Sequence, residues 1–463
     1  MKTSFMTVAV IAASITAGCT VGPDYKRPPV VSPDVFRGAE PAAAQTTGTS
    51  FADERWVDVF QDDSLRELIK TALAQNYDVR LAATRILQAE AQYGLTRANQ
   101  FPEVNGQAQA QSQHGTLAAG RTLPTIGSGS IGASLSWELD FWGKFRRATE
   151  SARAVILASE WGRRAVLTTL VSQVASSYFS LRALDLELEI ANRTVGSRQE
   201  SLKLTQVREQ GGVTALVDVR QAEQLVYSAN GLIVDLQRRI EQEENAISVL
   251  LGRNPNAIPR GRALIDQPHA PELPAGLPSA LLNRRPDIQQ AEQLIVAANA
   301  QIGVARAAYF PQITLTASGG VASSALATLF TNGTWAVAGS ALQPIFNAGR
   351  TKSRVALAKA QTEEASLVYQ LTILQAFREV SDALVGYRRS REFRDTQEAL
   401  VRSAEDARRL ADLRYRGGAT SYLEVLDSDT RLFSAQLDLV QAQLSEVAAF
   451  VEIYRALGGG WQS

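Results

Sequence analysis

The segment Ile131-Gly-Ala-Ser-Leu-Ser-Trp-Glu-Leu-Asp140 alternates apolar and polar side chains along most of its length. Because successive side chains of a β-strand point to opposite faces, this pattern predicts a strand with one apolar and one polar face. The stretch from Lys144 to Gln210 follows almost at once. It is rich in Ala, Leu, Glu, Arg and Gln, and its apolar residues recur at steps of three and four, as on one face of a helix. The chain is therefore predicted to pass directly from a strand into a long helix.

Three further segments show the same alternation: 104–113, 313–321 and, more weakly, 334–345. Alternating segments of about ten residues with aromatic ends are typical of a transmembrane β-barrel. The alternative is the half-buried sheet of a soluble protein. Four strands cannot close a membrane barrel, because the smallest have about eight, and open edges are excluded from hydrocarbon. Copies of the chain must then share one barrel. Two copies would give about eight strands with a filled interior, and three would give about twelve with room for a passage.

Long helices are predicted where proline is missing. Proline is absent between Pro124 and Pro255 and again after Pro344. Since a proline inside a helix costs about 3 kcal/mol, long helices can form in these stretches. The first would be roughly 100 Å long at the usual rise per residue. It ends at Gly211-Gly212, and its counterpart in the second half ends at Gly417-Gly418. Each half is therefore predicted to contain a long antiparallel helical hairpin with a glycine tip.

The two halves of the chain repeat each other. Residues 89–102 and 298–311 are identical at eight of fourteen positions, at an offset of 209. The glycine tips match at an offset of 206, as do Leu251-Gly252 and Leu457-Gly458. Two unrelated helical domains would not keep this register, so we infer an internal duplication.

The N-terminus predicts the compartment. Lys2 precedes a short apolar run and then Thr16-Ala-Gly-Cys19, which together have the form of a cleaved secretory signal. The final cysteine resembles that of a lipobox, in which the thiol carries the lipid and Cys19 becomes the first residue of the mature protein. Thr20 follows in place of Asp, which by this resemblance implies sorting to the outer membrane. The alternative is that Cys19, the only cysteine, is an ordinary buried thiol.

These features predict the organisation of the whole chain. It comprises a signal peptide (1–18), a lipidated N-terminal tether (19–60), a first repeat (61–254), a proline-rich connector (255–280) and a second repeat (281–463). The first repeat is expected to hold strands at about 103–113 and 130–140 and a helical hairpin at 144–252 with its tip at 211–214. The second is expected to hold strands at about 312–322 and 334–345 and a helical hairpin at 350–457 with its tip at 417–420.

The composition disfavours several functional classes. Lys and Arg number 47 and so do Asp and Glu, so the charge balance does not indicate a nucleic-acid binder. Only His114 and His269 are histidines, and neither lies in a motif for metal or nucleophilic chemistry, so an enzyme is not expected. A passive lipid-anchored coiled-coil spacer would explain the helices but not the strands.

Several motifs resemble one family. They are Cys19-Thr-Val-Gly-Pro-Asp-Tyr-Lys-Arg-Pro28, Ser134-Leu-Ser-Trp-Glu-Leu-Asp-Phe-Trp-Gly-Lys144, Leu282-Asn-Arg-Arg-Pro-Asp-Ile288 and Arg414-Tyr-Arg-Gly-Gly-Ala-Thr-Ser-Tyr-Leu-Glu-Val-Leu-Asp427. As a set they resemble the outer-membrane efflux channel family of TolC and OprM, and above all its NodT-type lipoprotein branch, which serves resistance-nodulation-division pumps. The resemblance extends from about Trp56 to Gly460.

The resemblance implies an α+β membrane protein. A homotrimer would form a twelve-stranded β-barrel in the outer membrane, continued by a long α-helical periplasmic barrel. Its partners would be a periplasmic membrane-fusion adaptor protein, an inner-membrane resistance-nodulation-division transporter and outer-membrane lipids. No cofactor is expected other than the covalent lipid on Cys19. The implied function is the exit duct of a tripartite efflux system for small molecules such as drugs. The alternative is a type I secretion duct for polypeptides.

The same resemblance locates a periplasmic gate just beyond the glycine tips. The family's aperture is ringed by residues that match Leu423 and Asp427, with an acidic contribution near Asp218. The repeat aligns Asp218 with Glu424 and Val217 with Leu423. The alternative is that these acids only stabilise the starts of their helices, by about 0.3–1 kcal/mol each. The expected adaptor contacts or gate-locking residues are Arg208, Gly211, Gly212, Arg414, Gly417 and Gly418.

The lipid anchor leads to a first prediction. Cys19→Ala should abolish lipidation yet leave the barrel able to insert, because the strands supply their own apolar band. Metabolic labelling with palmitate tests this. Label that persists on the variant would exclude Cys19 as the site of the lipid.

Overall fold

The structure is a computed structural model that describes residues 20–38, 50–114, 126–267, 276–324, 328–331 and 333–461. The predicted signal peptide, Cys19 and His269 lie outside these residues. The chain divides into two compact units. The first is built from the chain up to Pro29, Thr84–Glu160 and Gln290–Gln370, and the second from Val30–Ala83, Trp161–Gln289 and Leu371–Ser463.

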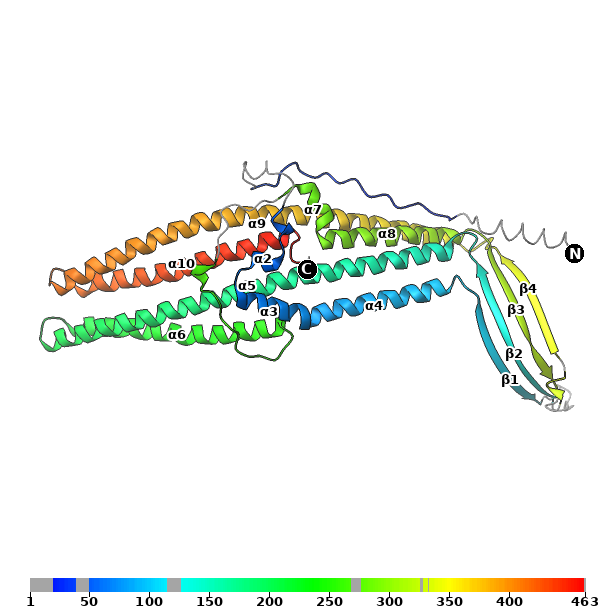
Figure 1. The fold of residues 1–463 in the computed structure, drawn as a ribbon, viewed down its shortest axis with the longest axis horizontal. Helices are drawn as coiled ribbons and strands as arrows, with labels where there is room; N and C mark the ends of the chain where they lie inside the picture. The colour runs from blue at the N-terminus through cyan, green and yellow to red at the C-terminus, as the bar shows by residue number, and fades with distance from the viewer. Residues whose placement is uncertain are drawn as a thin grey trace. The chain divides into compact units, whose positions relative to one another are not determined.

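The first unit contains a four-stranded antiparallel sheet. Its strands are β1 (Glu103–Gln113), β2 (Ile126–Leu139), β3 (Gln312–Ser323) and β4 (Gly333–Leu342). They lie side by side in chain order (Figure 1). Two boundaries differ from the expected ones by more than one residue. β2 begins at Ile126 instead of residue 130, because its Gly-Ser-rich start pairs with β1 although it has no apolar periodicity. β4 ends at Leu342 instead of residue 345, near Pro344, which has no N–H to extend the ladder.

The strand register separates an apolar from a polar face. Leu135 pairs with Val104 on one side and with Ala317 on the other, and Ala317 pairs in turn with Val337. Directly paired residues lie on the same face, so these side chains form one apolar surface across the sheet. On the opposite face, Glu138 pairs with Thr314. The exposed fractions on the apolar side are 65% for Val104 and 72% for Val337. An outward apolar face backed by a polar one is typical of strands that face lipid.

Each strand joins a long helix. α4 (Tyr77–Ala98) leads into β1, β2 into α5 (Lys144–Gln210), α8 (Pro286–Ala307) into β3, and β4 into α9 (Arg350–Arg416). α5 and α9 each have 67 residues and contribute to both units. Among the described residues, no helix combines the length and the apolarity needed to span a bilayer.

Two shorter helices complete the hairpins of the second unit. α6 (Leu216–Leu250) returns beside α5 and α10 (Tyr422–Ala456) beside α9 (Figure 1). The other helices of this unit are η2 (Phe51–Asp53), α2 (Trp56–Val59), α3 (Asp63–Gln75), η3 (Leu264–Asp266) and α7 (Pro278–Arg284). α6 begins at Leu216, just after the predicted tip at 211–214, because Ala215 has an extended backbone.

Parts of the predicted tether are packed against the helices. In the second unit, Phe51 and Phe60 are 4% and 2% exposed, and both rings contact Tyr454, at centroid distances of 5.4 and 6.1 Å. In the first unit, the Val21 N–H donates to the carbonyl of Trp142 at 3.1 Å. Val21, Phe51 and Phe60, which lie in the predicted tether (19–60), are therefore held against the helices by a backbone hydrogen bond and by aromatic burial.

A buried carboxylate organises the second unit around the start of α3. Asp62 is 1% exposed and accepts hydrogen bonds from the Ser64 N–H at 2.9 Å, the Tyr178 hydroxyl at 2.9 Å and the Arg262 N–H at 2.8 Å. Burial raises the pKa of Tyr178 well above its ordinary value, which keeps that hydroxyl a donor. The Tyr178 oxygen also accepts from the Gly261 N–H at 2.8 Å. Asp62 thus joins α3, α5 and the connector after α6.

This arrangement predicts that Asp62→Ala is strongly destabilising. Removal of the carboxylate leaves several buried donors without an acceptor, and each costs about 1–3 kcal/mol. We expect the melting temperature of the detergent-solubilised protein to fall by at least about 5 °C. Asp63→Ala is the matched control, because the Asp63 side chain is 94% exposed and pairs at the surface with Arg66. Equal melting temperatures for the two variants would contradict the role of Asp62.

Candidate functional site

The tips of the two hairpins have the same backbone construction. In the first tip, the Gly212 N–H donates to Glu209 at 2.9 Å and the Val213 N–H donates to Arg208 at 2.8 Å. In the second, Gly418 and Ala419 make the corresponding bonds at 3.0 and 2.8 Å. This pattern ends a helix with a residue of positive φ, which glycine adopts without strain. Gly212 and Gly418 have φ of 72° and 73°.

The two glycines of each pair have different roles in ending the helix. Gly211 and Gly417 retain helix-type bonds, to Val207 at 3.1 Å and Leu413 at 3.0 Å, whereas the second glycine of each pair reverses the chain. A Cβ atom at Gly212 or Gly418 would meet no other atom within 4 Å. Backbone conformation, not crowding, therefore requires glycine at these two positions.

A buried cluster joins the two hairpins just beyond the tips. Its members are Ala222 of α6, Ala411 and Tyr415 of α9, and Tyr422 and Val425 of α10. Arg208 of α5 crosses to α9, where its guanidinium lies 4.6 Å from the centroid of the Tyr415 ring and donates to the Tyr415 carbonyl at 3.3 Å. Arg208 thus connects the first hairpin to the second through a specific contact.

The predicted apolar gate residues point away from this cluster. Tyr422 and Val425 are 3% and 2% exposed, whereas Leu423 is 59% exposed and its repeat partner Val217 is 57% exposed. The inward face of α10 is therefore occupied by Tyr422 and Val425. Leu423 and Val217 present apolar surface outward from the single chain.

The predicted acidic residues each have a local partner. Asp218 and Glu424 occupy the first turns of α6 and α10, and each accepts from the threonine four residues earlier, Thr214 or Thr420. Arg414 pairs with Glu424 at 3.2 Å. Asp427 pairs with Arg431 of its own helix at 2.8 Å. An acid in the first turn of a helix stabilises that helix. Asp218 and Glu424 therefore also fit the alternative role, in which they only stabilise the starts of their helices.

Sequence reasoning missed a buried ion cluster in the same region. The Arg198 side chain, 3% exposed, donates to Asp429 at 2.8 Å and to the Leu225 carbonyl at 2.9 Å. Arg408 pairs with the other oxygen of Asp429 at 3.2 Å. Burial, and then the charge of Asp429, raise the pKa of Tyr422 to about 12. The cluster joins α5, α6, α9 and α10 by charged and polar contacts.

One signal in the sequence could have indicated Arg198. It lies at helical spacing between Val195 and Leu202, on the same stripe that carries the apolar side chains of α5. A charged residue on a buried stripe needs a partner. The sequence does not identify that partner, since Asp429 is 231 residues away.

Comparison with known proteins identifies the chain. The model of the outer membrane efflux protein family matches residues 68–253 and 277–459. The chain belongs to this family. Among curated relatives, the probable efflux pump outer membrane protein TtgC of Pseudomonas putida is 37% identical over 468 residues, which cover 100% of this chain and 96% of TtgC. The cation efflux system protein CusC of Escherichia coli is 34% identical over 453 residues, which cover 97% of this chain and 98% of CusC.

A solved structure gives the same result for the fold. The open state of the Neisseria gonorrhoeae MtrE outer membrane channel matches with a TM-score of 0.85 at 32% identity, over 96% of this chain and 99% of MtrE. The predicted family and α+β membrane fold are confirmed. This outer membrane efflux protein is the outer-membrane component of a tripartite efflux system and extends into the periplasm. Its family consists of transport channels and not of enzymes.

The buried ion cluster of this efflux protein predicts a local loss of stability in Arg198→Gln. Removing one partner of a buried ion pair costs about 3–5 kcal/mol. We expect a loss of stability at the lower end of this range, because Arg408 still pairs with Asp429. Hydrogen–deuterium exchange of peptides that cover residues 193–204 and 425–436 should accelerate. Arg409→Gln is the control, because Arg409 is 61% exposed and pairs only with exposed Asp406. Unchanged exchange in Arg198→Gln would contradict a stabilising role for the cluster.

Proposed function

We propose that three copies of the chain form a lipid-anchored exit duct whose periplasmic end is closed by a ring of Leu423, Glu424 and Asp427. The observation that carries the proposal is the exposure of Leu423 and Val217 beside acidic residues at the tips, while neighbouring Tyr422 and Val425 are buried. Apolar side chains at these related positions in both repeats are available to contact further copies of the chain.

The open sheet supports an assembly of several copies. Within the described residues, β1 and β4 lie at the two edges of the sheet, and each pairs with one strand only. A strand edge in hydrocarbon leaves unpaired N–H and C=O groups, each of which costs several kcal/mol. Pairing β1 of one copy with β4 of the next satisfies both edges. Three copies of a four-stranded sheet make a barrel of about twelve strands, which is wide enough for a passage.

Three copies also bring the acids of the tips together around one axis. Asp218, Glu424 and Asp427 then contribute up to about nine carboxylates to a narrow aperture, where like charges repel and cations are favoured. Arg414 and Arg431 offset part of this charge within each chain. Arg208 holds the first hairpin against the second at Tyr415. Packing of Leu423 against its copies would complete the closed state.

The lipid on Cys19 is part of the same proposal. Thr20, the next residue, lies against Gly143 in the first unit, where an added Cβ atom would come within 2.9 Å of the threonine methyl group. Gly143 directly precedes α5 at the junction with β2. Thr20, the first residue that the structure describes, therefore lies at this strand–helix junction. That position suits an anchor in the membrane next to the strands.

The partners and the cargo follow from the relatives. TtgC is named as an efflux pump component and CusC as part of a cation efflux system. These names support small molecules or ions as cargo, instead of the polypeptides of a type I secretion duct. We propose a periplasmic adaptor and an inner-membrane resistance-nodulation-division transporter as partners. The adaptor would contact the tips through Gly211, Gly212, Gly417 and Gly418, with Arg208 and Arg414 beside them.

The gate is tested by electrophysiology. In planar bilayers we expect low single-channel conductance with a preference for cations. Glu424→Ala combined with Asp427→Ala should weaken that preference and reduce block by divalent cations, because the carboxylates that attract cations are removed. Leu423→Ser should raise the conductance, because it removes apolar contacts from the seal.

A matched control separates the gate from general surface charge. Asp406→Ala removes an acid that is 72% exposed on α9 and lies outside the predicted ring, and it should leave selectivity unchanged. Native mass spectrometry should show trimers in every variant. Unaltered selectivity and conductance in all gate variants would assign the acids to helix stabilisation alone. A stable folded monomer of the unmodified protein would contradict the assembly.

A further inference from the structure

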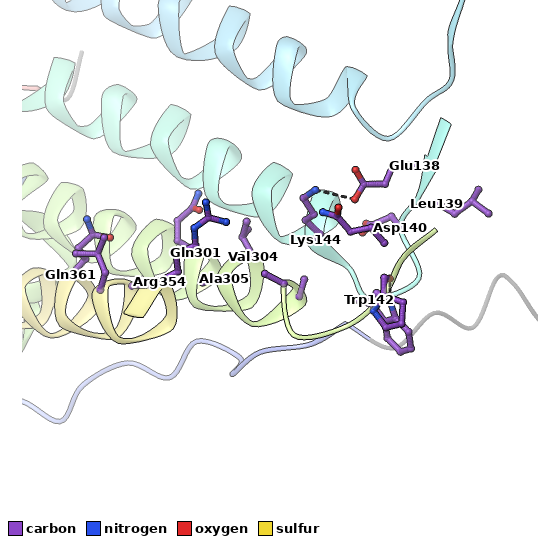
Figure 2. A pocket seen from close by; sticks show the side chains of 16 residues that line it. Glu138, Leu139, Asp140, Trp142, Lys144, Gln301, Val304, Ala305, Arg354 and Gln361 are labelled. Carbon is purple, nitrogen blue, oxygen red and sulfur yellow. Dashed lines mark hydrogen bonds and ion pairs between the residues drawn. The ribbon is translucent and has the colours of Figure 1, made fainter. Parts of the chain in front are cut away.

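A pocket lies in the first unit where the strands meet the helices. Its volume is about 440 Å³, and it is lined by the end of β2, the start of α5, the last turns of α8 and the first turns of α9 (Figure 2). Pockets that bind small molecules commonly measure about 300–1,000 Å³. Much of the wall is apolar, with Leu139, Trp142, Val304, Pro311 and Leu357 among its side chains.

The two acids of the pocket are already compensated. Glu138 pairs with Lys144 at 2.9 Å, as the dashed line in Figure 2 shows. Asp140 accepts from the N–H groups of Phe145 and Arg146, at 3.0 and 2.9 Å, and pairs with the Arg146 side chain at 3.3 Å. Each carboxylate thus has a cation as partner. The acids of the pocket leave no negative charge to balance a further guanidinium.

Arg354 is that further guanidinium. It is exposed on α9, lines the pocket, and forms no ion pair or hydrogen bond with any other residue that the structure describes. Gln361 lies two turns further along the same face of α9 and also lines the pocket. The pocket therefore combines an uncompensated positive charge and an amide donor with an apolar wall.

The start of α9 is itself basic. Its first turn contains Arg350 and Lys352 and no acid, and the start of α5 has Lys144 and Arg146 at the equivalent positions of the first repeat. Cations at a helix N-terminus are opposed by the helix dipole, which favours anions there. Both repeats thus have bases where the helix alone would favour acids. Of these four bases only Lys144 lines the pocket, where it is paired with Glu138, so Arg354 supplies the uncompensated positive charge of the lining.

The pocket is adjacent to the polar face of the sheet. Glu138 reaches it from that face, on which it pairs with Thr314, and Thr314 pairs with Ser340. In the proposed trimer, the polar face of the sheet lines the duct and the apolar face contacts lipid. A molecule in transit would therefore pass the pocket.

We propose that this pocket binds an organic anion with an apolar body that is present inside the duct. The carboxylate or sulfonate of the anion would bind the Arg354 guanidinium, with Gln361 as a second donor. The apolar body would lie against Val304, Pro311 and Leu357. The inference rests on the proposed function, because it requires the polar face to line a passage. It adds to that function a site for an anionic ligand in the wall of the duct and the residue that binds this ligand.

The test uses the intact protein in detergent with 2-naphthoate as the probe. Isothermal titration calorimetry should show saturable binding of one naphthoate per chain, with weaker binding of 2-naphthamide and of 2-naphthylmethylammonium. Arg354→Gln should weaken naphthoate binding by at least about tenfold, since hydrogen bonds to charged groups are among the stronger ones. Arg354→Lys should retain part of the affinity. Lys352→Gln is the matched control, because Lys352 is exposed on the same helix but does not line the pocket.

Several outcomes would overturn the proposal. Unmodified protein that binds no naphthoate would show that the pocket is closed, for example by a neighbouring copy. Equal affinity for naphthoate and naphthamide would show that charge plays no part, and equal losses in Arg354→Gln and Lys352→Gln would indicate a diffuse positive field. Native mass spectrometry and bilayer conductance of the same samples test the duct independently. A conducting trimer without naphthoate binding would overturn this inference alone, whereas a monomer without channel activity would contradict the proposed function.

Discussion

The fold depends on the hydrogen-bonding requirement of the backbone at the two edges of the sheet. In the described part of the chain, β1 and β4 each pair on one side only, and the face that carries Val104 and Val337 is apolar and exposed. Water would satisfy the edges but not the apolar face, and lipid would satisfy the apolar face but not the edges. Pairing between copies satisfies both. The membrane location and the need for several copies follow from this one constraint, and a passage follows when three copies share the barrel.

The duplication explains how one chain supplies two equivalent segments of the wall of the proposed duct. Each repeat places two strands between long helices, and each hairpin ends with the same arrangement of backbone hydrogen bonds, in which Gly212 and Gly418 have nearly the same φ. The tips are thus built alike, but their side chains differ. Among the residues that the structure describes, the Asp218 carboxylate accepts from Thr214, whereas Glu424 accepts from Thr420 and also pairs with Arg414. The second repeat therefore has more charged contacts at the proposed aperture than the first.

Charged side chains serve two different purposes in this protein. Asp62 and the Arg198–Asp429 pair are enclosed and fully partnered, so they join segments that are distant in sequence into one arrangement. Arg354 is exposed, without a partner among the described residues, and beside an apolar wall. A partnered buried charge stabilises one conformation. A cation without a partner at the surface of a pocket remains available to a ligand.

Much of this protein could be predicted from its sequence, because the deciding information is local or periodic. Alternation over 131–140 predicted a strand with one apolar and one polar face, the proline-free stretches predicted long helices, and the repeat located both tips. The start of β2 could not be predicted, because the Gly-Ser-rich residues from Ile126 become a strand only through pairing with β1. The exposure of Leu423 could not be predicted either, since Tyr422, Leu423 and Val425 are all apolar or aromatic, and only packing on α9 decides which of them turn inward. Contacts such as Arg198 with Asp429 join residues 231 positions apart. Spacing along the chain carries no information about such pairs, so only the tertiary structure decides them.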